Sequence, residues 1–278
     1  MRARLPAHLS ILRPHNMLAS ALAVVAGNSI ARGGMTRDVV VTAALAALVT
    51  GAGNILNDQF DLEVDRINKP DRPLPSGRVT PGGAYRMYTT ISLIATTACG
   101  WLLPRPVAAV IVVWQLALAV YARWAKPRFI VNNLMVAAIS SSSFLAGAML
   151  AHNARAAIIP VAIAFVFVLC REIVKGVEDV IGDRKGGVLT LAVALGAEEA
   201  GTVAAVLMLL LAAMLPVPAL TAHYRAPYLL TMELAVAPLL LSGAMRVVNA
   251  SARRQFTLTS RLLKLGMFLG IAAIWLGA

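Results

Sequence analysis

Nine long apolar runs dominate the chain and decide what it can fold into. A helix needs about 20 mostly apolar residues to cross the hydrocarbon core of a bilayer, and each run has roughly that length. The runs cover residues 15–31, 38–57, 84–103, 106–124, 130–151, 155–174, 199–220, 227–248 and 259–277. With 59% apolar and 14% charged residues among 278, the chain is far more apolar than a soluble domain. The sequence therefore predicts an all-α integral membrane bundle of nine transmembrane helices, forming one domain over residues 1–278.

The chain is strongly basic, with a formal net charge of +12. In the nine-helix topology, 20 of the 25 lysines and arginines fall in the N-terminal tail and in the loops on its side of the membrane. Cytoplasmic loops carry such an excess, so we predict a cytoplasmic N-terminus in a multi-pass protein of the cell membrane. The positive charge is assigned to topology and to contacts with membrane lipids, and no nucleic-acid partner is expected.

Acidic residues are scarce, and nine of the 13 lie in two short windows. The first window follows the second apolar run and spaces Asn57, Asp61 and Asp65 four residues apart, on one face of a helix. The second follows the sixth run and spaces Asp179 and Asp183 in the same way. Like charges at this spacing repel each other, so a divalent cation that neutralises them is the natural reason for the pattern. Oxygen ligands favour Mg²⁺, which is often shared with the phosphates of a substrate.

Both acidic windows fall on the predicted cytoplasmic side, so the active site is expected there. Facing each other, they would hold Mg²⁺ around a diphosphate. The predicted metal ligands are Asn57, Asp61, Asp65, Asp179 and Asp183. The basic residues expected to complete this clamp are Arg72, Lys126, Arg171 and Lys175. An allylic prenyl diphosphate would lose diphosphate here and leave a delocalised carbocation, which an apolar cavity among the helices would shield from water.

At this point the residues resemble a known family. The pattern NDxxDxxxD at 57–65, followed by DRPLPSG at 71–77, resembles the first signature of the UbiA-type intramembrane prenyltransferases. The DxxxD pattern at Asp179–Asp183 resembles their second signature, and nine spans with these motifs after the second and sixth also match. The resemblance covers most of the chain. It implies a Mg²⁺-dependent transferase that moves a prenyl group from an allylic diphosphate.

The resemblance also implies roles for residues outside the acidic windows. Tyr121 and Lys126, in the YARWAK stretch, correspond to a feature near the diphosphate, and Arg13 and Asn16 to a segment near the acceptor. Asp58 is our candidate for helping to deprotonate the attacking hydroxyl, which requires surroundings that raise its pKa.

Three further residue types carry weaker signals. Asn133, at the start of the fifth run, either caps the helix or contacts substrate. The four histidines are scattered along the chain and form no evident ligand set. The two cysteines lie far apart inside apolar runs and are interpreted as packing residues.

The acceptor is predicted from residues 171–196, which most resemble the archaeal lipid enzymes of the family. Those enzymes attach a second geranylgeranyl chain to the glycerol 2-hydroxyl of geranylgeranylglyceryl phosphate, so geranylgeranyl diphosphate is the expected donor. Aromatic-acceptor members more often carry an acidic residue and a tyrosine where this chain has Glu172 and Lys175. A lysine suits a phosphate-bearing acceptor.

Two other functions stay open from the sequence. One is prenyl transfer to an aromatic acceptor similar to 4-hydroxybenzoate, as in quinone biosynthesis. The other is cation transport, because ionisable residues inside a membrane often mark ion paths. Two observations argue against transport. The acidic residues cluster at one face of the membrane, and Glu233 is the only acidic residue in the middle of a predicted span.

Overall fold

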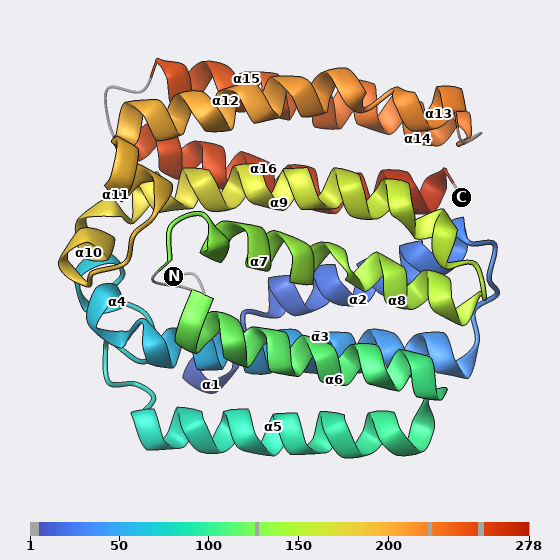
Figure 1. Ribbon diagram of the computed structural model, residues 1–278, viewed down its shortest axis with the longest axis horizontal. Coiled ribbons are helices and arrows are strands. Elements are labelled where there is room, and N and C mark those ends of the chain that lie inside the picture. Colours follow the sequence, from blue (N-terminus) through green and yellow to red (C-terminus); the bar gives the residue numbers. More distant parts are fainter. Residues whose placement is uncertain (1–5, 126–127, 222–223, 250–252, 278) are drawn as a thin grey trace.

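The computed structural model describes residues 6–125, 128–221, 224–249 and 253–277, and over these residues the chain is helical, without a strand. The α-helices are α1 (Ala7–Leu12), α2 (Pro14–Ile30), α3 (Arg37–Phe60), α4 (Leu62–Asn68), α5 (Pro81–Leu102), α6 (Arg105–Val120), α7 (Val131–Ser141), α8 (Ser143–Leu150), α9 (Ile158–Glu178), α10 (Val180–Lys185), α11 (Leu191–Leu195), α12 (Ala197–Met214), α13 (Val217–Thr221), α14 (Ala226–Thr231), α15 (Ala237–Val248) and α16 (Arg253–Leu276). Short π-helical or 3₁₀ turns join some of them: η1 (Tyr121–Ala125), η2 (Ala154–Ala157) and η3 (Met232–Val236). The long helices run side by side along one axis (Figure 1). The predicted all-α class is confirmed.

Seven helical stretches in the described part of the chain are long and apolar enough to cross a membrane. They are Arg37–Phe60, Arg105–Ala125, Val131–Leu150, Ala154–Glu178, Ala197–Thr221, Ala226–Val248 and Arg253–Leu276. The remaining two predicted runs coincide with α2, which has 17 residues, and α5, which contains four threonines. Both lie outside that set. Length and composition therefore establish a multi-pass membrane bundle, but the predicted count of nine spans is not confirmed.

The outer surface of the bundle is apolar. Large side chains point away from the core, among them Trp101 at 86%, Leu220 at 77% and Leu234 at 74% exposure. A soluble monomer rarely exposes apolar surface on this scale, whereas lipid acyl chains cover it in a membrane.

Prolines lie where several of the long helices end. The α5 helix ends at Leu102, and α6 begins at Arg105, directly after Pro104. The α12 helix ends at Met214, and Pro216 precedes the short α13. Proline has no N–H to donate to the preceding helical turn, so each helix ends before it. Leu103 and Pro104 thus form a tight hairpin between α5 and α6, and Pro216 divides the seventh apolar run into α12 and α13.

Two glycines allow α2 and α8 to approach very closely. A Cβ on Gly147 would lie 1.9 Å from the carbonyl oxygen of Val24, and a Cβ on Gly27 would lie 2.1 Å from that of Phe144. The hydroxyls of Ser20 and Ser143 lie 3.2 Å apart in the same interface. Small residues at such crossings let the backbones themselves make the contact, which is how helices associate in membranes.

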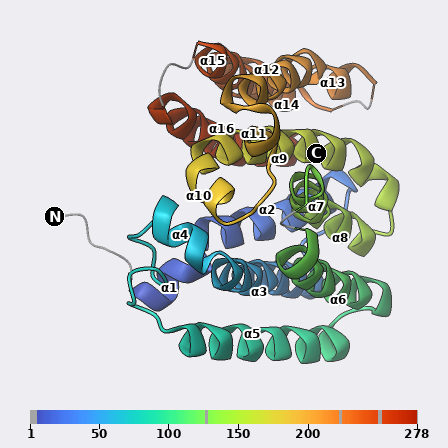
Figure 2. The same cartoon turned by 60° about the vertical axis from the view of Figure 1, so that its left-hand side comes forward.

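The short helices gather at one end of the bundle. Figure 1 shows α4, α10 and α11 together at its left-hand end, where α3 and α9 terminate and α5 and α12 begin. Turning the molecule keeps α4 beside α10, with α1 close by (Figure 2). The sequence prediction that both acidic windows lie at the same end of the bundle is therefore confirmed.

Candidate active site

In each acidic window, a long helix is followed directly by a short helix. Asp61 stands between the end of α3 and the start of α4, and Asp179 stands between α9 and α10. The Asp61 N–H donates to the Asn57 carbonyl at 3.0 Å, and the Asp65 N–H donates to that of Asp61 at 2.7 Å. The helical hydrogen-bond spacing thus continues across the junction between α3 and α4. The sequence pattern did not predict that the helix would be interrupted there.

A single asparagine joins the two windows. Asn68, the last residue of α4, donates from Nδ2 to the Asp179 carbonyl at 2.7 Å, and its Oδ1 accepts from the Gly182 N–H at 3.0 Å. Gly182 leaves the space for this contact, because a Cβ there would lie 2.4 Å from Asn68 Nδ2. The backbone of the second acidic segment is therefore held directly against the first.

The two windows meet around a small cavity of about 80 Å³, here called the acidic cavity. All five predicted metal ligands line it: Asn57, Asp61, Asp65, Asp179 and Asp183. Predicted substrate ligands also line it: Arg13, Arg72, Tyr121, Asn133 and Lys175. Acids that are more than 100 positions apart in the sequence thus surround one space.

Arginines neutralise the buried acids of the first window. Asp58 and Asp65 have side chains only 3% and 5% exposed. Arg13 pairs with Asp58, and Arg72 pairs with Asp65 and lies 3.5 Å from Asp58. Burial raises the pKa of the Asp65 carboxyl, although the positive charge of Arg72 acts in the opposite direction. These contacts hold the carboxylates in place at the mouth of the cavities.

A lysine from the first window neutralises the second. Lys69 pairs with Oδ2 of Asp179, so one charge pair connects the two halves of the site. Burial lowers the pKa of Lys69, and the carboxylate of Asp179 offsets part of this effect. The other carboxylate oxygen, Oδ1 of Asp179, is buried without a hydrogen-bond partner among the described residues. An unpaired buried oxygen is costly, so it marks a position suited to a cationic ligand.

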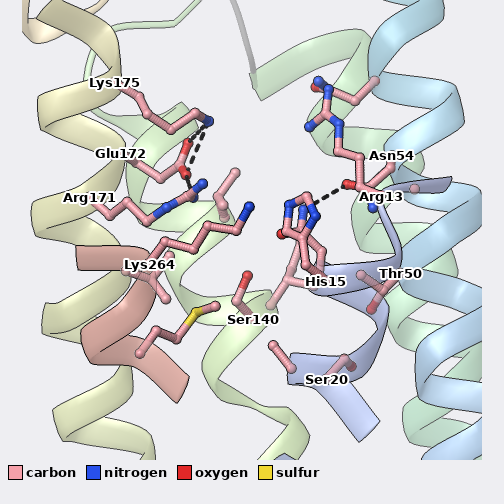
Figure 3. Close-up of a pocket in the computed structure, with 18 of the residues that line it drawn as sticks. Arg13, His15, Ser20, Thr50, Asn54, Ser140, Arg171, Glu172, Lys175 and Lys264 are labelled. Carbon is pink, nitrogen blue, oxygen red and sulfur yellow. Dashed lines mark hydrogen bonds and ion pairs between the residues drawn. The ribbon is translucent and has the colours of Figure 1, made fainter. Parts of the chain in front are cut away.

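A much larger cavity of about 810 Å³, here called the central cavity, adjoins the acidic one. The two share lining residues: Arg13, Asn57, Lys69, Arg72, Tyr121, Glu172 and Lys175. Away from this polar mouth the walls are mostly apolar, with Phe144, Phe167 and Ile271 among them. Figure 3 shows its polar groups pointing inward from opposite sides. A space of this kind suits a long apolar chain with a charged head.

The remaining predicted residues divide between the two cavities. Arg171, Asn16 and Asp58 line the central cavity, whereas Asn133 lines the acidic one. Lys126 lies outside the described residues. Asp58 thus lines the central cavity and not the acidic one, although Arg72 contacts both Asp58 and Asp65.

Several residues of the site were missed from the sequence. Lys69 and Asn68 follow the first motif directly, so their position was a usable signal. His15 and Lys264 line the central cavity, although the first was grouped with scattered histidines and the second was counted only as a topological charge. Glu172 forms ion pairs with both Arg171, at 2.8 Å, and Lys175, at 2.9 Å.

The donor set fits magnesium by its chemistry. The lining offers carboxylate and amide oxygens, the ligands that Mg²⁺ prefers. Among the described residues, no three Asp, Glu, His or Cys side chains converge closely enough to enclose an ion by themselves. Mg²⁺ usually keeps several waters and is bound through one or two carboxylates together with the phosphates of a substrate.

Almost the whole chain is similar to known proteins. Residues 17–274 match the UbiA prenyltransferase family. A digeranylgeranylglyceryl phosphate synthase of Methanopyrus kandleri is 35% identical over 96% of this chain and 97% of its own. One from Methanothermobacter thermautotrophicus is 33% identical, covering 98% of this chain and 95% of its own.

Solved structures share the fold. One concerned with digeranylgeranylglyceryl phosphate synthase in membranes has a TM-score of 0.72 at 25% identity, with 98% of each chain covered. A UbiA homologue from Archaeoglobus fulgidus, bound to GPP and Mg²⁺, has a TM-score of 0.67 at 18% identity and covers 96% of this chain and 99% of its own. The resemblance read from the two acidic motifs is confirmed, and the chain belongs to the UbiA prenyltransferase family.

Proposed function

We propose that this protein transfers a geranylgeranyl group from an allylic diphosphate to the 2-hydroxyl of geranylgeranylglyceryl phosphate. The observation that carries the proposal is the junction of the two cavities. Acids from two distant helices surround a small polar space, and a large, mostly apolar space opens beside it. The names of the relatives, at 33–35% identity over almost the full chain, support this acceptor.

Magnesium is the cofactor we assign to the acidic cavity. Asn57, Asp61 and Asp65 would bind it from the first window, and Asp179 and Asp183 from the second. The unpaired Oδ1 of Asp179 supports this role. When bound, the metal neutralises negative charge on the departing diphosphate.

The side chains at the shared mouth bind the diphosphate. Arg72 and Lys69 pair with carboxylates and also line the central cavity, so they present positive charge to both spaces. Tyr121 lines both spaces, and Asn133 lines the acidic cavity. The apolar walls hold the prenyl chain and exclude water, so the allylic carbon reacts with the acceptor and not with water.

Asp58 is the group we assign to the acceptor hydroxyl. It lines the central cavity beside Arg13, with which it pairs. As the bond between the allylic carbon and the 2-hydroxyl oxygen forms, the bond to diphosphate breaks and the hydroxyl proton passes to Asp58. Asn16 lies in the same wall and donates a hydrogen bond to Asn54 at 3.4 Å, which orders the acceptor side.

We also propose how the protein is oriented in the membrane. We assign α2 and α5 as membrane spans, giving nine in one domain, with the N-terminus and the acidic end facing the cytoplasm. The excess of lysine and arginine at that end supports this orientation.

Labelling of single cysteines tests the orientation. In Lys185→Cys, an impermeant thiol reagent is expected to react only in inside-out vesicles, and in Arg225→Cys only in right-side-out ones. Both positions are exposed, at opposite ends of the bundle, and the native Cys99 and Cys170 are buried, which keeps the background low. The reverse pattern would overturn the orientation.

Acceptor selection tests the reaction itself. Purified protein with geranylgeranyl diphosphate and Mg²⁺ is expected to release diphosphate and form an ether with geranylgeranylglyceryl phosphate, but not with 4-hydroxybenzoate. Product from 4-hydroxybenzoate alone would overturn the acceptor. Absence of diphosphate release with every acceptor would overturn prenyl transfer, and cation flux without any such release would favour a transporter.

A further inference from the structure

Three basic side chains gather in the central cavity beyond the acidic one. His15 comes from α2, Arg171 from α9 and Lys264 from α16, and we call them the basic cluster. Figure 3 shows Lys264 extending into the cavity toward His15, with Arg171 beside it. None of the three lines the acidic cavity. They form a polar region separate from the proposed metal ligands.

The basic cluster carries more positive charge than its surroundings compensate. Among the described residues, Lys264 forms no ion pair, and the charges that act on it most are the positive ones of Arg171 and Arg13. The same cations act on His15. Glu172 is shared between Arg171 and Lys175, so this one carboxylate faces two cations.

Arg171 also has a donor available. Its Nη1 donates to Glu172 at 2.8 Å, but its Nε is buried without a hydrogen-bond partner in the described structure. Glu178, the other carboxylate in this part of the wall, accepts a hydrogen bond from Thr257 at 3.2 Å. Gathering like charges with unused donors inside a largely apolar cavity is unfavourable unless an anion binds between them.

We propose that the basic cluster binds the phosphate of the acceptor, as a second anion site separate from the diphosphate site. This inference rests on the proposed function, which supplies a phosphate monoester as acceptor. The positive charge of the basic cluster and the number of its hydrogen-bond donors fit a phosphate monoester. Such a group presents three strong acceptor oxygens and close to two negative charges. Lys264 supplies ammonium donors, Arg171 guanidinium donors and His15 a ring N–H.

The arrangement gives the acceptor a fixed direction. Arg13 stands between the two anion sites, since it pairs with Asp58 and lines both cavities. A phosphate on the basic cluster therefore places the attached glycerol next to the wall that carries Asp58. The basic cluster selects the phosphorylated acceptor over an uncharged alcohol with the same chain.

Binding without donor or Mg²⁺ tests the site directly. With Trp101, Trp124 and Trp275 replaced by phenylalanine, the fluorescence of Trp114, which lines the central cavity, can report the Kd values of geranylgeranylglyceryl phosphate and of unphosphorylated geranylgeranylglycerol. Wild-type protein is expected to bind the phosphorylated form more tightly. In Lys264→Met this preference should fall about 10- to 100-fold, the value of one hydrogen bond between charged groups. The Kd of the uncharged alcohol and the KM of the donor should not change.

Two variants control for structural effects. Lys264→Arg is expected to keep most of the preference, and Arg261→Met, which removes an exposed charge from the same helix, to keep all of it. Lys264→Met with an undiminished preference, or with equally weakened binding of both acceptors, would overturn the site. Preferential binding of the phosphorylated acceptor without ether formation would contradict the proposed function and leave the anion site standing.

Discussion

Asp61→Asn and Asp179→Asn are each expected to lower the rate of prenyl transfer by about 10²- to 10³-fold, the usual cost of removing one preorganised electrostatic group. The two residues lie at matching junctions, one after α3 and one after α9, and both line the acidic cavity. Each substitution removes a charged ligand from the same proposed metal site. Because the ligands act as a unit, the double variant should lose little more than either single one. Diphosphate release measured against Mg²⁺ concentration checks both points.

Controls separate lost chemistry from lost folding. Glu63→Gln changes a carboxylate in the same window that is 77% exposed and pairs with Arg66, and it should retain full activity. Asp179→Asn leaves Lys69 as a partly buried cation without its partner, so its stability is compared with that of Lys69→Met/Asp179→Asn, which removes both charges of the pair. The double variant should regain stability while staying inactive. Wild-type rates in either single variant would contradict the shared metal site.

Gly147→Ala is expected to lower the free energy of unfolding by about 3 kcal/mol, at the upper end of overpacking costs. Its Cβ would lie 1.9 Å from the Val24 carbonyl oxygen, and because that atom belongs to the backbone, α2 itself must move. Ser20 and Phe144, on the same two helices, line the central cavity, so acceptor binding should weaken as well. Thermal unfolding in detergent is expected to show a Tm lower by roughly 5–10 °C.

A second helical glycine provides the matched control. Gly100 lies in α5, and a Cβ there would meet nothing within 4 Å. Gly100→Ala should therefore raise stability by about 0.5–1 kcal/mol, since alanine favours a helix over glycine. If the two variants unfolded at the same temperature, the close contact between α2 and α8 would not limit stability.

Local sequence predicted the parts of the fold that local physics controls. Bilayer thickness sets the length of apolar runs, so the positions of the long helices followed from the lengths of those runs. The four-residue spacing of the acids likewise placed Asp61 beside Asp65. The interruptions at Asp61 and Asp179 were missed, because helical hydrogen-bond spacing continues through them.

These sequence patterns did not predict contacts between segments that lie far apart in the chain. Lys69 and Asp179 form an ion pair between the two halves of the chain, and the sequence around either residue gives no indication of its partner. His15 and Lys264 are almost 250 positions apart, so neither drew attention until the fold placed both on one cavity. One acidic motif identifies a helix end, but only the packing of α4 on α10 turns two helix ends into a site.

The distribution of ion pairs sets the order in which this site can form as the chain emerges from the ribosome. Arg13 and Arg72, the partners of Asp58 and Asp65, belong to the first 72 residues, so the first acidic segment is already neutralised when it is made. The pair between Lys69 and Asp179 must wait for another hundred residues of synthesis. The late pair and the hydrogen bonds of Asn68 to Asp179 and Gly182 therefore form in the same, second stage of synthesis.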